Sequence, residues 1–261
     1  MGCAGASVKF RDETEAAKFL LGEATSQLQK QGVQFVIVGG WSAFLFHSNR
    51  YGHPGTFDVD VLIHSDSLDD GTFSAAADAL LAAGYLRAPK NLYQAHRLLD
   101  VRDETLVFHV DFLNERDPGN AVRIVAGTGR MKSIYTDAMR AVFKHGNFRT
   151  HPDYPNVRFP SPETFIVTKA AAAVVKKRER DAFDIFVTVQ DQPLVFNEEW
   201  RRLRDEDELF AVANAALRKA VEEGDALEKI ERVLREMQAS SHRAFSMPTE
   251  GDLRKAFAFL N

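Results

Sequence analysis

Apolar and polar positions in the first part of the chain follow the spacings of both helices and strands. Stretches with apolar or small side chains at helical spacing stop at Gly32 and Gly84, which predicts helices that end there. Shorter stretches between and after these glycines are continuously apolar or alternating, which predicts strands. The predicted elements are helices over residues 13–30 and 72–83 and strands over residues 33–38, 57–63 and 106–113.

The pattern becomes helical throughout after Pro160. Ser161 is a typical helix cap, and Pro162 fits the first turn of the helix that follows. Upstream of this point, residues 118–154 show only short strand-like pieces and a helical pattern around residues 136–143. We therefore place a domain boundary near Pro160.

The fold predicted from these patterns is an α/β (α+β) domain with a mixed sheet over residues 1–159, followed by an all-helical region over residues 160–261. No Gly/Ser-rich or Pro-rich linker separates the two halves. The helical patterns of the second half cover residues 163–177, 181–189, 197–221, 226–237 and 252–260.

Composition narrows the class of protein. The 261 residues are 45% hydrophobic, enough to bury a sizeable core, and carry a formal charge of -4. A surface that is basic throughout is therefore excluded, and any nucleic-acid contact must come from a local patch. Cys3 is the only cysteine, which excludes a disulfide framework and fits a reducing cytoplasm.

The sequence predicts a cytoplasmic protein without a membrane segment. No apolar run approaches the roughly 20 residues that cross a bilayer, and the start of the chain lacks the order of a signal peptide. Met1, Gly2 and Cys3 raise the question of N-terminal acylation, but Ala6 stands where the myristoylation pattern has Ser or Thr.

Two aspartates occupy alternate positions of the predicted strand over residues 57–63. Asp58 and Asp60 project from one face, with Cα atoms about 6.5–7 Å apart at the usual strand rise. Such a pair can hold one or two divalent ions. On another predicted strand, Asp111 shares a face with His109. We expect Asp111 to complete the metal site and to accept the proton of an attacking hydroxyl.

A glycine pair separates the strand over residues 33–38 from a helical pattern that begins at Trp41. A turn without side chains lets a phosphate approach closely, and a helix start offers free backbone N–H groups. Ser42 adds a hydroxyl. We expect Gly39, Gly40 and Ser42 to bind the triphosphate of a nucleotide.

Each of these features alone also has an ordinary structural explanation. A glycine pair between a strand and a helix is common packing, and Asp58, Asp60 and Asp111 each fit a solvated strand face. Like charges side by side repel, however, and aspartate is a poor strand former. The three features together, in this order, indicate phosphoryl-group transfer, which uses carboxylate-held metal ions and donors to the phosphates.

The segments that hold these residues are Val38–Ala43, Thr56–Ile63 and His109–Leu113. Together they resemble the nucleotidyltransferase superfamily of the polymerase-beta type. The segments Thr168–Ala172 and Arg180–Asp184 are similar to nucleotidyltransferases of the AbiEii and MenT type, many of which are toxins of toxin-antitoxin pairs. The resemblance covers residues 35–189.

The resemblance implies a nucleotidyltransferase-fold domain and an enzyme that passes NMP from a nucleoside triphosphate to an acceptor hydroxyl and releases pyrophosphate. Mg²⁺ or Mn²⁺ is the implied cofactor. The chain departs from the related pattern at Pro54, where a basic residue is usual, and Arg50 is the nearest basic candidate. The implied roles are the triphosphate for Gly39, Gly40 and Ser42, metal for Asp58, Asp60 and Asp111, and nucleotide support for Lys169.

Three cations and one carboxylate fall on a narrow stripe if the pattern after Pro160 is wound as one helix at about 100° per residue. They are Lys169, Lys176, Arg180 and Asp184. We predict that the three cations bind the nucleotide. A solvated helix face explains Lys176 and Arg180 equally well.

Three functions are consistent with the sequence. The first is transfer of NMP to RNA, especially a tRNA end, in a toxin with an antitoxin partner. The second is modification of a small hydroxylated antibiotic of the aminoglycoside or lincosamide kind. The third is a nucleotide-binding sensor without turnover, which the presence of all three aspartates disfavours. A basic acceptor groove would favour RNA, and an acidic one would favour a cationic drug.

Overall fold

The computed structural model forms two compact units. The sheet unit comprises Met1–Ile37 and Thr56–Asp137, and the helical unit comprises Val38–Gly55 and Ala138–Asn261. The predicted boundary near Pro160 divides the chain differently, and it remains a prediction of domain organisation. The structure describes residues 9–47, 51–116, 125–126, 131–173, 179–191, 193–223, 225–240 and 245–261.

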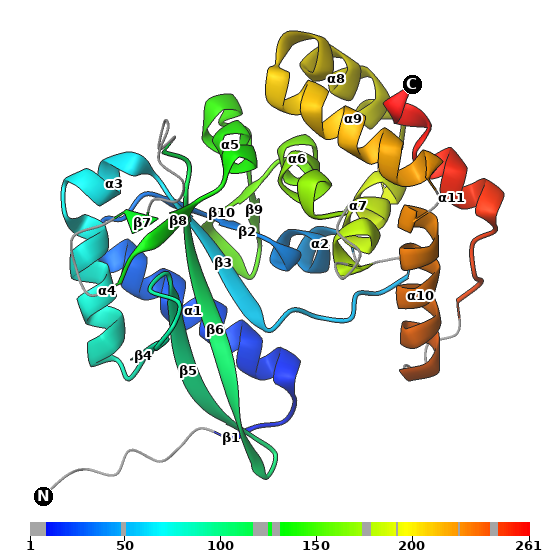
Figure 1. The fold of residues 1–261 in the computed structure, drawn as a ribbon. Helices are drawn as coiled ribbons and strands as arrows, with labels where there is room; N and C mark the ends of the chain where they lie inside the picture. The colour runs from blue at the N-terminus through cyan, green and yellow to red at the C-terminus, as the bar shows by residue number, and fades with distance from the viewer. Residues whose placement is uncertain are drawn as a thin grey trace, which may run out of the picture. The chain divides into compact units, whose positions relative to one another are not determined.

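The described strands of the sheet unit form one mixed sheet (Figure 1). Its main path has the order β1-β5-β6-β3-β2, with β4 beside β5, β8 beside β6 and β7 beside β8. β3 and β6 are parallel, whereas β5 and β6 form an antiparallel hairpin. The predicted mixed sheet is therefore confirmed. The strands are β1 (Lys9–Phe10), β2 (Phe35–Val38), β3 (Asp58–Ile63), β4 (Leu86–Arg87), β5 (Gln94–Val101), β6 (Glu104–Asn114), β7 (Val125–Ala126) and β8 (Ser133–Tyr135).

Helix α1 (Glu13–Lys30) packs on one face of this sheet, in contact with β3, β5 and β6. Arg97 of β5 shows which face this is, because its Nε lies 3.3 Å from Oε2 of Glu23 on α1. Side chains alternate across a strand, so the even-numbered positions of β5 point away from α1. We call the side of β3, β5 and β6 opposite α1 the open face. The same unit contains α3 (Ser65–Asp69) and α4 (Thr72–Ala82).

The helical unit confirms the predicted all-helical region, since every described element after Pro160 is a helix. Aromatic side chains such as Phe165, Phe183 and Trp200 are fully buried in its core. None of the described helices combines the length and apolar character needed to cross a membrane. The elements are α2 (Gly40–Phe46), α5 (Arg140–His145), β9 (Phe148–His151), β10 (Tyr154–Pro160), α6 (Pro162–Ala173), α7 (Glu179–Asp191), α8 (Pro193–Glu206), α9 (Glu208–Glu222), α10 (Asp225–Ser240) and α11 (Glu250–Ala256), with short 3₁₀ turns at Asp137–Met139 and Ala258–Leu260.

The single helix predicted over residues 197–221 is two helices, because Asp207 interrupts it. Asp207 has extended backbone, and its Oδ1 accepts a hydrogen bond from the backbone N–H of Leu209 at 2.8 Å. Its Oδ2 lies 2.7 Å from Nζ of Lys144 and 2.8 Å from Nε2 of His145. A residue within an acidic run is thus a buried helix cap, and α9 begins where this cap places it.

Glycine substitutions test the end of α4. Gly84 has a φ of 94°, in the left-handed region, and a Cβ there would collide with the guanidinium group of Arg97. We predict that Gly84→Ala lowers the free energy of unfolding by roughly 1–2 kcal/mol. Gly22, in the middle of α1, has open space around its Cα. As the matched control, Gly22→Ala should raise stability by about 0.5–1 kcal/mol. Urea denaturation measures both, and equal effects of the two substitutions would contradict the prediction.

Candidate active site

Strand pairing places the three candidate carboxylates on the open face. Asp58 and Asp60 of β3 alternate with Val59 and Val61, which are fully buried on the side of α1. In the parallel pairing of β3 with β6, Asp60 lies opposite Asp111. Neighbouring strands are about 4.8 Å apart, so the register brings these carboxylates into one small area. The alternation predicted for Asp58 and Asp60 is confirmed, and the strand pairing adds Asp111 to the same face. The roles of the residues stay predictions.

Gln94 holds the carboxyl of Asp111. Its Nε2 donates a hydrogen bond to Oδ1 of Asp111 at 2.7 Å, and its Oε1 lies 2.9 Å from Nε2 of His96. Because the amide oxygen can only accept, Nε2 of His96 carries the proton in this chain of hydrogen bonds. The ring of His96 meets that of His109 edge to face, with centroids 4.6 Å apart. Sequence reasoning missed Gln94 and His96, since it did not predict β5.

The environment of Asp111 favours its neutral form. Burial raises the pKa of this carboxyl, and the nearby charge of Asp58 raises it further, although the hydrogen bond from Gln94 acts in the opposite direction. Burial also lowers the pKa of the His96 imidazole, with a further contribution from His109. Partial desolvation and the charge of Asp58 therefore make Asp111 a stronger base than a solvated aspartate.

The donor set suits a hard divalent cation, because all three candidate ligands are carboxylates. Burial and the charge of Asp58 both raise the pKa of Asp111. A bound cation would act in the opposite direction, because it favours the charged carboxylate. Among the described residues, no three His, Cys, Asp or Glu side chains converge around a single point that could hold a metal ion. The fit thus rests on the chemistry and the shared face of the carboxylates.

The glycine turn belongs to the helical unit and follows β2 directly in the chain. Gly39 has a φ of 70° and a ψ of -156°, a conformation that only glycine adopts readily. Gly40 is the first residue of α2. Ser42 is 3% exposed, and its Oγ is buried without a hydrogen-bond partner among the described residues. Such an orphaned hydroxyl is costly unless something outside the protein satisfies it.

Lys169 lies in a compact ionic cluster of the helical unit. Its Nζ is 2.7 Å from Oδ1 of Asp181 and 2.8 Å from Oδ2 of Asp184, and 13% of its side chain is exposed. Burial lowers the pKa of Lys169, but the two carboxylates outweigh this effect and raise it. The other oxygen of Asp184 accepts from Nε2 of His53 at 2.9 Å, while Nδ1 of His53 accepts from the backbone N–H of Gly55 at 3.1 Å.

These contacts correct the assumption of one continuous helix. Along an α-helix, residues 169 and 181 would be about 18 Å apart, yet their side chains form an ion pair. α6 and α7 are therefore two helices packed against each other, and Lys169 and Arg180 do not share a helical stripe. Lys176 lies outside the described residues. The role of Lys169 in nucleotide binding remains a prediction. In this structure the lysine is paired with two carboxylates.

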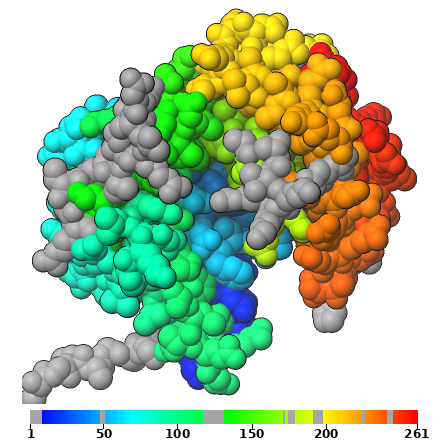
Figure 2. Space-filling model, in the orientation of Figure 1, coloured from blue at the N-terminus to red at the C-terminus, as the bar shows by residue number. Residues whose placement is uncertain are grey.

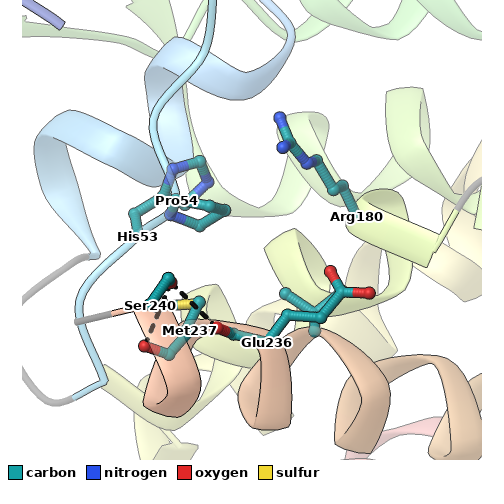
Figure 3. A pocket seen from close by; sticks show the side chains of 7 residues that line it. His53, Pro54, Arg180, Glu236, Met237 and Ser240 are labelled. Atoms are coloured by element: carbon teal, nitrogen blue, oxygen red, sulfur yellow. Dashed lines mark hydrogen bonds between the residues drawn. The ribbon is translucent and has the colours of Figure 1, made fainter. Parts of the chain in front are cut away.

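Arg180 has an exposed side chain and lines a pocket of about 410 Å³ in the helical unit. Figure 3 shows His53, Pro54 and Arg180 on one side of this pocket and residues of α10 on the other. The residues from α10 are Val233, Glu236, Met237 and Ser240. The predicted role of Arg180 in nucleotide binding stays a prediction.

Comparison with known proteins finds similarity in structure alone. The chain matches no protein-family model and no curated protein sequence. An antigenic nucleotidyltransferase-like protein from Paracoccidioides brasiliensis is 14% identical, with 87% of this chain and 94% of that chain covered and a TM-score of 0.47. The antibiotic-resistance factor ANT(2'')-Ia is 14% identical, with 87% and 93% covered and a TM-score of 0.36.

The raised pKa of Asp111 predicts that Asp111→Asn stabilises the metal-free protein. Above the ordinary pKa of an aspartate, folding must bury a charge beside Asp58, and an asparagine removes that charge. The gain should be at most about 1 kcal/mol, because residual solvent screens the repulsion. It should be present at neutral pH and vanish as the pH falls through roughly 4, where the unfolded carboxyl becomes neutral. Urea denaturation in EDTA at several pH values tests this, and a loss of stability at neutral pH would refute it.

The Lys169 cluster predicts a large effect of Lys169→Ala on stability. Removing the cation takes a close ion pair from each of the buried carboxylates Asp181 and Asp184, which typically costs roughly 3–5 kcal/mol. Asp184→Asn in the same background should recover part of the loss. Arg180→Ala is the control, since this exposed side chain should change stability by less than about 0.5 kcal/mol. If thermal unfolding shows equal effects of Lys169→Ala and Arg180→Ala, the cluster is not a structural element of this unit.

Proposed function

We propose that the chain is a metal-dependent nucleotidyltransferase, which transfers NMP from a nucleoside triphosphate to an acceptor hydroxyl. The observation that carries this proposal is the placement of Asp58, Asp60 and Asp111 on one open face by the register of β3 and β6. Three carboxylates side by side destabilise a sheet, so a structural role explains them poorly. A site for cations that accompany polyphosphate explains them well.

Asp58, Asp60 and Asp111 would hold Mg²⁺ or Mn²⁺. When bound, such ions neutralise charge on the triphosphate and so make its α-phosphorus more open to attack. The carboxylate chemistry of the three residues supports this assignment. The charge of Asp58, which raises the pKa of Asp111, supports it as well.

Asp111 is proposed to accept the proton of the acceptor hydroxyl. Its raised pKa makes it a better proton acceptor than an exposed aspartate, and the hydrogen bond from Gln94 orients its carboxyl. In the proposed reaction, the acceptor oxygen forms a bond with the α-phosphorus as its proton passes to Asp111. The bond between the α-phosphorus and the bridging oxygen of the β-phosphate breaks, and pyrophosphate leaves.

The glycine turn and Ser42 are proposed to contact the phosphates. The backbone of Gly39 is in a conformation that keeps a side chain away from the turn. Its neighbour Ser42 has a buried Oγ without a described partner, and a phosphate oxygen would accept a hydrogen bond from it. Lys169 and Arg180 are proposed to act on the nucleotide from the helical unit, as the resemblance to AbiEii-type enzymes implies.

The acceptor is either RNA or a small hydroxylated molecule. A toxin that modifies a tRNA end, with an antitoxin partner, follows from the resemblance alone. The basic stripe that favoured RNA is weakened, because Asp181 and Asp184 neutralise Lys169. This observation favours a small acceptor.

The decisive test is release of pyrophosphate and transfer of label from each radiolabelled triphosphate in the presence of Mg²⁺. Total RNA and a panel of hydroxylated antibiotics serve as acceptors. We expect Asp58→Ala/Asp60→Ala to lower the rate by about 10³-fold or more, as the loss of several kcal/mol of charge stabilisation predicts.

The matched control removes two carboxylates from an exposed place. Glu222 and Glu223 have side chains that are 66% and 65% exposed, in ion pairs near the end of α9. Glu222→Ala/Glu223→Ala should retain the activity of the wild type. The proposal fails if the wild type releases no pyrophosphate from any triphosphate, or if the two double variants are equally active.

A further inference from the structure

The open face continues from Asp60 and Asp111 along the β5–β6 hairpin, and Asp58 lies beside its second row, opposite His109. The antiparallel register sets paired residues in successive rows on this face, at two-residue intervals. Asp111 and Gln94 form the first row, and the imidazoles of His109 and His96 form the second. The third row is an apolar pair. Each step is about 6.5–7 Å, so the third row lies roughly 13 Å along the strand from Asp111.

The apolar pair of the third row consists of Leu98 and Val107. Their residues are 49% and 48% exposed, although the other face of the same strands is packed against α1. Two large apolar side chains directly opposite each other on an exposed sheet face form a small patch next to two imidazoles. Figure 2 shows the end of this hairpin as exposed surface at the bottom of the view.

The charges on the open face disfavour a nucleic acid. None of the described positions of β3, β5 and β6 that point to this face is a lysine or arginine. The row after the apolar pair holds Asp100, which accepts a hydrogen bond from Thr105 at 2.7 Å. Asp103 at the hairpin turn forms an ion pair with Lys9 of β1. RNA needs cations along its phosphates, and here it would meet carboxylates instead.

We propose that the acceptor lies on the second and third rows of this face, with an apolar or aromatic body on Leu98, Val107 and the two imidazoles. The acceptor is then a small, neutral or cationic hydroxyl compound rather than RNA. This inference rests on the proposed function, because it places the acceptor hydroxyl toward Asp111. The flat strand surface and the imidazole rings suit a planar group, and the carboxylates at both ends suit a positive one.

Binding can be measured without metal or triphosphate, so this test is independent of turnover. In full-length protein with ¹³C-labelled Leu and Val methyl groups, Leu98 and Val107 report on the patch. Val212 of α9 is the control, since it is 61% exposed and apolar but lies on a helix of the other unit. The probes are naphthaleneethanol and lincomycin, which have apolar bodies, kanamycin, which lacks one, and a short RNA that ends in CCA.

We expect naphthaleneethanol and lincomycin to shift the methyl signals of Leu98 and Val107 and to leave those of Val212 unchanged. Leu98→Thr/Val107→Thr keeps residues suited to a strand and should weaken this binding about tenfold or more, since it removes most of the apolar contact area. Val212→Thr should bind as the wild type does. A dispersed amide spectrum confirms that each variant is folded.

Two results would overturn the inference. The first is that neither apolar probe shifts the patch methyls, whether or not the RNA or kanamycin does. The second is that the double variant binds the apolar probes as tightly as the wild type. A wild type that binds these probes but releases no pyrophosphate would instead contradict the proposed function, and the two failures can be told apart.

Discussion

The parallel pairing of β3 with β6 is the constraint on which the candidate site depends. A shift of this register by one residue would turn Asp58 and Asp60 toward α1 and bring valines to the open face. The buried side chains of Val59 and Val61 prevent this shift, because each would lose its place in the core. Burial of apolar surface on one side therefore fixes the position of the charged groups on the other.

The same pairing has an electrostatic consequence. It holds carboxylates on adjacent positions, although strands with like charges opposite each other are less stable. At Asp111, burial and the charge of Asp58 both raise the pKa of the carboxyl. The hydrogen bond from Gln94 offsets part of this effect. A sheet that keeps such an arrangement gives up some stability.

The helical unit also holds carboxylates close together, but there a lysine lies between them. Lys169 compensates two buried carboxylates, and His53 donates to the second oxygen of one of them. Because Nδ1 of His53 accepts from the backbone of Gly55, the neutral form of the ring satisfies both hydrogen bonds. The cluster thus links the segment before β3 to α6 and α7 within this unit. It also explains why α7 carries the buried polar residues Asp181 and Asp184.

Local patterns predicted the elements whose stability is local. α1 begins and ends at the expected residues because its buried positions repeat at helical spacing. β3 alternates between core and open face over its first four residues, and its last three residues are all buried. The split between α8 and α9 was missed because the role of Asp207 comes from Lys144 and His145, which are distant in sequence. The continuous helix through Lys169 was wrong for the same reason, since only tertiary contacts show that α6 and α7 pack side by side.

The failure to predict β5 has a further physical cause. Its open-face positions are Gln94, His96, Leu98 and Asp100, so polar and apolar side chains are mixed where a simple strand would carry polar ones only. It also has few β-branched residues, and its extended form depends on pairing with β6. The strand that is hardest to recognise from sequence is therefore the one whose exposed side chains supply Gln94 to Asp111 and an apolar surface beside it.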